Sequence, residues 1–141
     1  HALLLAPKTR SADQDELWAA AKMEPLEAIL ASMQASSNTC ATLLLNGEPA
    51  CIFGCRYDGE TGYPWMIGSD LLVQHAKPFL QLCPTWVEKM RQGVTKLENY
   101  VDARNTVAIR WLKRLGFKFD DAAPYGPLNL PFHRFTMEGK P

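Results

Sequence analysis

The sequence lacks a cysteine pair of metal-binding spacing, a long apolar run and an excess of charge of either sign. Its four cysteines include no CxxC pair and its three histidines are scattered, so neither a zinc site nor a disulfide framework is indicated. We expect buried, reduced thiols and no metal. No apolar run approaches the roughly 20 residues that span a bilayer, and no signal peptide is evident. A cytoplasmic protein without membrane contact is therefore expected.

The charge balance argues against a nucleic-acid-binding protein. Lys plus Arg and Asp plus Glu both number 15, whereas nucleic-acid-binding domains normally carry a basic excess that displaces counterions. Hydrophobic residues make up 47% and charged residues 21% of the chain, which is typical of a globular protein. Because 141 residues suit one domain with one substantial core, we expect a single domain over residues 1–141.

The order of predicted elements favours an α/β fold with helices packed on a mixed sheet of about six or seven strands. Apolar periodicity and turn residues carry this prediction. We expect Pro84 to kink or divide the helical segment that contains it. In chain order, the predicted elements are a strand at 2–7, helices beginning at 11 and 25, a hairpin of strands 39–45 and 49–57 around an Asn-Gly turn, a strand at 63–69, a helical segment at 78–93, a strand at 96–101, a helix after 105, a short strand at 117–119, a Pro- and Gly-rich loop at 122–131 and a strand at 132–138.

The most strongly specified helix lies in the run VDARNTVAIRWLKRLGF at 101–117. Asn105 is a favourable residue for the start of a helix, and Gly116 can adopt the left-handed conformation that ends one. One face is apolar and the other basic, as expected for a helix against a core. The partner of the preceding strand should follow Gly116. The apolar residues are Ala108, Trp111, Leu112 and Leu115, and the basic residues are Arg110, Lys113 and Arg114.

The same run resembles a known family signature. Val101, Asn105, Ala108, Ile109 and the pair at 116–117 match the V-x-x-x-N-x-x-A-I … G-F pattern of the GNAT superfamily of N-acetyltransferases. The resemblance implies a GNAT-like α/β domain in which acetyl-CoA inserts where a strand and the helix after Asn105 separate. The stretches PWMIGSD, LENYVDARN and IRWLKRLGF also resemble small acetyltransferase-like proteins of short-tailed phages, one of which is an internal virion protein.

The resemblance also assigns cofactor-binding residues. It places acetyl-CoA against the end of one strand, the start of the next helix and Asn105. The pyrophosphate loop of the superfamily uses glycines, but the matching stretch LLVQHAKPF has none and Pro78 lacks an N–H. A helix dipole and polar side chains would have to attract the phosphates instead. The cofactor-binding residues implied are Ile67, Gly68, Ser69, Gln74, His75, Lys77 and Asn105.

Acetylation of an amine needs a base for the ammonium proton and donors for the developing oxyanion. Asp70 is the carboxylate best placed by sequence for the base, although it can equally cap a helix. Glu98 and Asp102 flank the next strand and are alternatives, or they are simply solvated. For the oxyanion, the resemblance implies a free backbone N–H beside Gly68.

The superfamily commonly has a Tyr seven residues after the Asn, which protonates the departing thiolate, but this chain has Leu112 there. Tyr125 is the candidate replacement. His133 is either a base, a substrate contact or a packed histidine. Four basic residues are expected either to contact a cofactor phosphate or to form a solvated helix face: Arg104, Arg110, Lys113 and Arg114.

Two functions remain open from the sequence. One is an acetyl-CoA-dependent N-acetyltransferase of an amine, with a host protein as its target. The other is a catalytically inactive phage protein of the same fold, which binds and modulates a host protein in the host cytoplasm or belongs to the virion.

Overall fold

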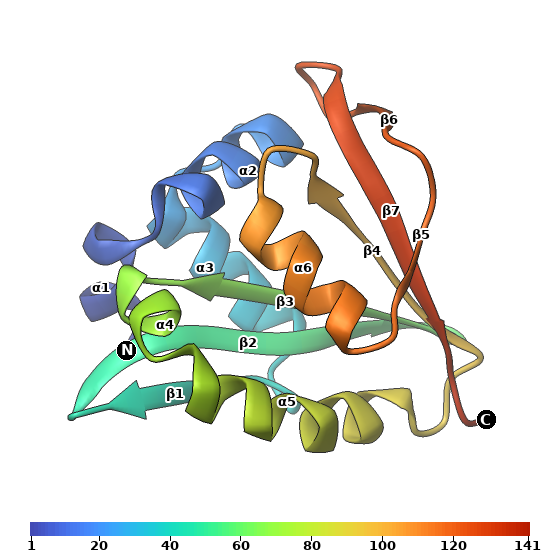
Figure 1. The fold of residues 1–141 in the computed structure, drawn as a ribbon, viewed down its shortest axis with the longest axis horizontal. Coiled ribbons are helices and arrows are strands. Elements are labelled where there is room, and N and C mark those ends of the chain that lie inside the picture. The colour runs from blue at the N-terminus through green and yellow to red at the C-terminus, as the bar shows by residue number, and fades with distance from the viewer.

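A seven-stranded mixed β-sheet organises the computed structural model, which describes residues 1–141. The strands are β1 Ala41–Leu45, β2 Glu48–Asp58, β3 Thr61–Gly68, β4 Lys96–Asp102, β5 Lys118–Phe119, β6 Ala123–Tyr125 and β7 Leu130–Glu138. Their order in the sheet is β1-β2-β3-β4-β7-β5, and β6 pairs with the beginning of β7 (Figure 1). The hairpin turn between β1 and β2 places Asn46 and Gly47 at positive φ, as an Asn-Gly turn requires.

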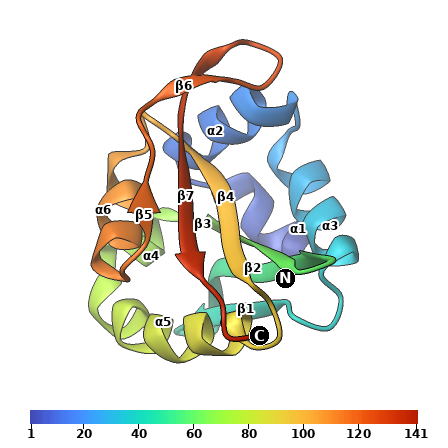
Figure 2. The same cartoon turned by 90° about the vertical axis from the view of Figure 1, so that its right-hand side faces the viewer.

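Helices cover both faces of the sheet, which confirms the predicted fold class. The helices α4, α5 and α6 lie on one side, and α1 and α3 lie on the other (Figure 2). No helix is both long and apolar enough to cross a membrane. The helices are α1 Ala2–Leu5, the 3-10 helix η1 Ala6–Lys8, α2 Ser11–Ala21, α3 Pro25–Ala35, α4 Asp70–Gln74, α5 Ala76–Arg91 and α6 Thr106–Arg114.

The two parallel strands in the middle of the sheet, β3 and β4, separate soon after they begin. They pair only through Thr61 with Lys96 and Gly62 with Leu97. Beyond these pairs β3 stays with β2 through Gly68, and β4 stays with β7 through Asp102. The sheet therefore opens into a V-shaped gap between β3 and β4 (Figures 1 and 2).

The N-terminal segment differs from the prediction, because residues 2–7 are helical and not a strand. Residues 2–6 are all Ala or Leu, with no β-branched residue, and both types are strong helix formers. Ala2 and Leu5 are buried while Leu3 and Leu4 are exposed, which is the three-residue spacing of a helix against the core.

Three further predictions are corrected by the structure. The helix α5 runs unbroken through Pro84, and the division of the helical segment comes earlier, at His75 between α4 and α5. The strand β5 does follow Gly116, but it pairs with β7, which lies between it and β4. The segment predicted as a Pro- and Gly-rich loop also contains the three-residue strand β6.

The helix α6 has the predicted boundaries and faces. It begins after Asn105, and Gly116 follows it at a φ of 101°. Trp111 is buried and packs against Phe79 of α5 with ring centroids 5.2 Å apart. The rest of the apolar stripe is half-buried, while Arg110, Lys113 and Arg114 are exposed. One face of α6 is thus turned toward the sheet, next to the gap.

Candidate active site

At its narrow end, the gap between β3 and β4 is closed by the side chain of Asn99. Its Nδ2 donates to the carbonyl oxygen of Pro64 on β3 at 2.8 Å. Its Oδ1 accepts from the backbone N–H of Tyr100 on β4, also at 2.8 Å. One neutral carboxamide therefore replaces the strand-to-strand hydrogen bonds that are lost where the strands part.

In the middle of the gap, the edge of β3 presents the backbone of Met66. Strand residues two apart direct their N–H and C=O groups to the same edge. Pro64 accepts from β4 through Asn99, and Gly68 directs its N–H away from β2, so Met66 faces the gap between them. Because β4 pairs with β3 only at Thr61 and Gly62, β4 gives the Met66 backbone no partner.

At its wide end, the gap is bridged by two carboxylates of α2. Asp13 Oδ2 accepts from the N–H of Gly68 at the end of β3, at 2.9 Å. Glu16 Oε1 accepts from the N–H of Asp102 at the end of β4, at 2.8 Å. Two acids one helical turn apart thus cap the ends of the two strands and hold α2 across the opening.

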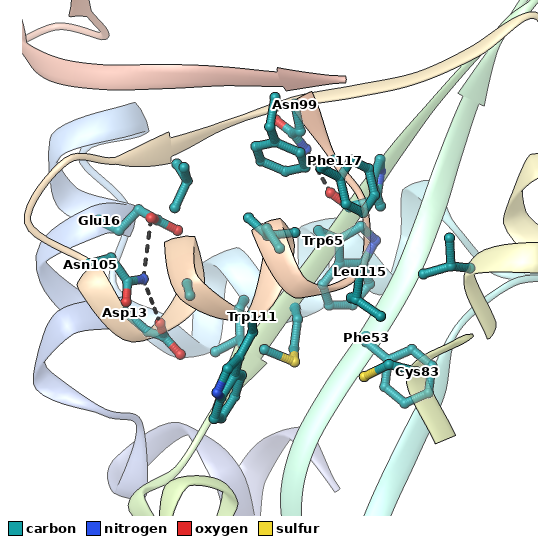
Figure 3. Close-up of a pocket in the computed structure, with 18 of the residues that line it drawn as sticks. Asp13, Glu16, Phe53, Trp65, Cys83, Asn99, Asn105, Trp111, Leu115 and Phe117 are labelled. Carbon is teal, nitrogen blue, oxygen red and sulfur yellow. Dashed lines mark hydrogen bonds between the residues drawn. The ribbon is translucent and has the colours of Figure 1, made fainter. Parts of the chain in front are cut away.

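The side chain of Asn105 lies between these two acids (Figure 3). Its Nδ2 donates to Asp13 Oδ1 at 3.2 Å and to Glu16 Oε1 at 3.3 Å. Asn105 is buried, and its Oδ1 has no hydrogen-bond partner. The residue precedes α6 as predicted, but it makes no side-chain hydrogen bond to the first turn of the helix. Its carboxamide donates instead to the two acids of α2, Asp13 and Glu16.

Burial makes this cluster a poor place for negative charge. Removal from water raises the pKa of Glu16 to about 8, and the neighbouring Asp13 carboxylate adds to the shift. Burial also raises the pKa of Asp13, although Arg10, at 3.1 Å from its Oδ1, opposes the shift. A carboxyl that titrates near neutrality can accept and return a proton at physiological pH, as acid–base chemistry requires.

An apolar pocket of about 440 Å³ lies behind the gap, and 24 of its 30 lining residues are hydrophobic. Asp13, Glu16 and Asn105 line it at the wide end. Tyr125 also lines it and stacks on Tyr100, with ring centroids 4.1 Å apart and planes 16° apart. The other walls come from β2, β3, β4, α5, α6 with the residues just after it, and β7. They include Phe53, Trp65, Trp86, Trp111, Leu112, Leu115, Phe117, Phe132 and Phe135.

The residues predicted as a site fall into three groups. Ile67, Asn105 and Tyr125 line the pocket. Gly68 and Ser69 are buried at the wide end of the gap, where the space beside Gly68 is filled by Leu72, 2.9 Å from the position of a Cβ. The remaining four are exposed on α4 and at the start of α5, outside the pocket: Asp70, Gln74, His75 and Lys77.

The predicted oxyanion donor beside Gly68 is already engaged. The Gly68 N–H donates to Asp13, and the Ser69 N–H donates to the carbonyl of Ala50 at 2.8 Å. Sequence reasoning missed Asp13, Glu16 and Asn99 as site residues. In the sequence, the acids near the start of α2 match the ordinary preference for negative charge at a helix N-terminus, and no local pattern shows that α2 lies across two distant strands.

The other candidate groups are paired elsewhere. Glu98 forms an ion pair with Arg134. Asp102 is buried and paired with Arg104 at 2.7 Å. The Nδ1 of His133 lies 2.9 Å from the carbonyl oxygen of Asp120. None of these three side chains lines the pocket.

No protein-family model matches the chain, and no curated protein is significantly similar to it in sequence. Solved structures, in contrast, match it along most of its length. The ribosomal-protein-S18-alanine N-acetyltransferase of Escherichia coli matches with a TM-score of 0.65 at 18% identity, over 99% of this chain and 87% of that one. The fold is that of the GNAT acetyltransferases.

Two further GNAT-fold structures were solved with coenzyme A. An acetyltransferase of Bacillus subtilis in complex with CoA has a TM-score of 0.61 at 15% identity, over 95% of each chain. The aminoglycoside acetyltransferase AAC(6′)-Ib in complex with coenzyme A has a TM-score of 0.63 at 20% identity, over 93% of this chain and 84% of that one. At these identities the likeness establishes the fold alone.

Proposed function

We propose that this GNAT-fold protein is an N-acetyltransferase that takes acetyl-CoA in the gap between β3 and β4 and acetylates an amine. The observation that carries the proposal is the wide end of the gap. There the half-buried carboxyl of Glu16, with its pKa raised to about 8, lines an apolar pocket beside the buried, unpartnered carboxamide oxygen of Asn105. Such a combination of perturbed acid, unsatisfied polar atom and cavity favours a reaction site over a purely structural cluster.

The gap suits the amide-containing arm of the cofactor. The N–H and C=O of Met66 face the gap without a partner on β4, so an extended amide can pair with this edge as a strand does. Ile67 and Asn105 line the adjoining pocket, and Gly68 and Ser69 follow at its wide end. We include these four residues in the proposed binding site.

The phosphates require a different solution from the glycine loop. The helix α5 begins at Ala76, and Pro78 in its first turn offers no N–H. Beside this turn, Lys77, Gln81 and Arg114 line a second cleft between α5 and α6. We propose that these side chains, with Gln74 and His75 at the end of α4, hold the phosphates through charge.

In this proposal Glu16 is the general base. Acetyl-CoA supplies an activated acetyl group, and its transfer to an ammonium substrate yields an amide, the CoA thiol and one proton. Glu16 takes the ammonium proton at Oε2, the carboxylate oxygen that makes no hydrogen bond within the chain. Asp70, the base suggested by the sequence, is exposed and lies outside the pocket, but it is close enough to raise the pKa of Asp13. It remains an alternative proposal.

The proton for the departing thiolate needs a second group. Leu112 lines the pocket and has no proton to give. Tyr125 lines the same pocket, and burial, with a smaller contribution from Tyr100, raises its pKa above the ordinary value, so its hydroxyl stays protonated at neutral pH. We propose Tyr125 as the acid, with water as the alternative.

Binding and turnover of acetyl-CoA test the proposal. Calorimetric titration should give a dissociation constant between micromolar and millimolar, which corresponds to a binding free energy of roughly 4 to 8 kcal/mol. Met66→Pro, which removes a gap-facing N–H as Pro64 already does, should weaken binding about tenfold relative to Met66→Ala. Thiol release should depend on an added amine. No heat and no thermal shift at millimolar acetyl-CoA would refute the proposal.

A second function is favoured by Leu112, which occupies the pocket where a proton donor is expected. In this alternative the protein keeps the fold and binds a partner without turnover. The resemblance to phage proteins suggests that the partner, or the acetylated amine in the first proposal, belongs to a host protein. Binding of acetyl-CoA without thiol release for any amine would favour this alternative.

A further inference from the structure

The three acids at the wide end of the gap, Asp13, Glu16 and Asp102, differ in whether a cation neutralises them. Asp13 is paired with Arg10 at 3.1 Å, and Asp102 is paired with Arg104 at 2.7 Å. Glu16 lies between them and has no ion pair; it accepts only from the Asp102 N–H and from Asn105 Nδ2. The Glu16 side chain is half-buried, and carboxylates withdrawn from water are normally paired, so the missing partner of Glu16 is a cation.

Asn105 supplies a second acceptor at the same place. Its orientation is fixed, because turning the carboxamide over would direct Oδ1 toward Asp13 and Glu16 in place of the donating Nδ2. The Oδ1 atom is left buried without a donor, which costs about 1–3 kcal/mol. A ligand that donates to it recovers this energy. The group that satisfies both Asn105 and Glu16 therefore carries a positive charge and more than one N–H.

The walls of the pocket define what the cation is attached to. Ten of the 30 lining residues are aromatic, Trp65, Tyr100 and Tyr125 among them, and most of the others are aliphatic. Hydroxyl or ammonium groups distributed along a ligand would lose water here without gaining partners. Aromatic faces also attract a cation at the head of an apolar body.

We propose that the acceptor is a primary amine on an apolar, aromatic-sized body, held with its ammonium between Glu16 Oε2 and Asn105 Oδ1. This inference rests on the proposed function and names the substrate class of the same site. A small arylalkylamine and the N-terminal residue of a peptide share this chemistry. Polyhydroxylated amines do not.

Binding of 2-phenylethylamine, measured without acetyl-CoA through tryptophan fluorescence or calorimetry, tests the inference. The matched probe 2-phenylethanol has the same body without the charge, and 2-phenylethyl-trimethylammonium has the charge without donors. We expect the amine to bind about ten- to a hundredfold more tightly than either. Equal binding of amine and alcohol, or no binding of the amine, would overturn the inference. A short peptide with an N-terminal phenylalanine distinguishes the two sources: tighter binding of the peptide identifies a peptide N-terminus, and tighter binding of the free amine a small molecule.

Variants locate the contact. Glu16→Gln should weaken binding of the amine about tenfold or more and leave binding of the alcohol unchanged within about twofold. Asp15→Asn removes the same charge from the exposed face of α2 and should leave both unchanged. Equal losses in the two variants would contradict the assignment. Acetyl-CoA binding is measured separately, so cofactor binding without amine binding refutes the substrate class but not the proposed function.

Discussion

The two ends of the gap between β3 and β4 solve the same problem with different chemistry. At the narrow end, the neutral carboxamide of Asn99 satisfies one polar group on each strand and has no unused atom. At the wide end, Asp13 and Glu16 satisfy the last N–H of each strand, but they bring buried charge, raised pKa values and the unpartnered oxygen of Asn105.

The difference indicates which end is structural and which is functional. A neutral carboxamide would suffice at both ends if the only task were to join the strands. Acids cost more to bury than amides, and the wide end leaves Glu16 without a cation. A ligand that neutralises Glu16 would offset the free-energy cost of burying these acids. We therefore assign the chemistry to the wide end and the structural role to the narrow end.

Glu16→Gln should have the largest effect. The variant keeps the shape of the side chain and its ability to accept from the Asp102 N–H, but it cannot take a proton. We expect acetyl transfer to fall about 10²- to 10⁴-fold, equivalent to about 2.7–5.4 kcal/mol in the barrier. Steady-state thiol release measures it, with Asp15→Asn as the charge-matched control. A loss smaller than threefold with wild-type folding would remove Glu16 from the chemistry and return Asp70 to consideration.

Asn99→Ala should act on stability and not on chemistry. It leaves the Tyr100 N–H and the Pro64 carbonyl without their partner, which should lower the free energy of unfolding by about 2–3 kcal/mol. Urea denaturation measures this change. Asn38→Ala, at an exposed position, should stay within about 0.5 kcal/mol of the wild type. If Asn99→Ala proved as stable as that control, the narrow end would not be the structural one.

The fold could be predicted from the sequence where local signals were strong. The Asn-Gly turn predicts the hairpin of β1 and β2, and the apolar spacing after Asn105 predicts α6; both elements have the predicted type. The strand predicted for residues 2–7 was wrong. An Ala- and Leu-rich run is apolar in either structure, and only the burial of every third residue shows that it is a helix. The predicted partner of β4, a strand directly after Gly116, was also wrong. The true partner is β7, and because β5 and β6 intervene in the sequence, no local pattern shows this pairing.

Of the candidate site, the sequence indicated only residues connected with the signature of α6. Asn105 stood out through its place before an apolar helix, and Tyr125 through the absence of a donor at Leu112. Glu16 could not be found in this way, because its neighbours in the sequence are also acidic and only the fold separates exposed Asp15 from the pocket. The functional part of α2 is defined by long-range hydrogen bonds to Gly68 and Asp102.

The pH dependence of stability should distinguish the two ends. The pKa of Glu16 is raised from 4.5 to about 8 in the folded state, so the folded protein holds more protons than the unfolded chain in this window. A rise of the pKa from 4.5 to about 8 corresponds to about 5 kcal/mol at most. Because the Glu16 side chain is only half-buried and water screens its charge, stability should fall by about 1–3 kcal/mol as pH rises from about 4.5 to 8. The charged groups around Glu16 are Asp13 and Arg10 on one side and Asp102 and Arg104 on the other.

Asp13 contributes in the same direction, because its pKa is also raised. Burial opposes ionisation of Asp102, but hydrogen bonds from Arg104 outweigh it and lower the pKa, so its contribution is lost only in more acidic solution. Glu16→Gln should flatten the profile between pH 4.5 and 8, whereas Asn99→Ala should shift it downward without changing its shape. Thermal unfolding at a series of pH values measures both, and a wild-type profile that rises over this window would contradict the assignment.

The smallest expected effect lies outside the gap, in the cleft lined by Lys77 and Arg114. If this cleft holds only the phosphates, Arg114→Ala should raise the KM for acetyl-CoA about two- to fivefold, because an exposed charge contact contributes about 0.5–1 kcal/mol. The effect should shrink in high salt, and kcat should not change, in contrast to Glu16→Gln. Arg110 is exposed on the same helix but does not line the cleft, so Arg110→Ala is the matched control. Equal KM values for the two variants would mean that the basic face of α6 acts as a diffuse charge and that the phosphates lie elsewhere. A fall in kcat for Arg114→Ala alone would instead connect the cleft to the reaction at the wide end.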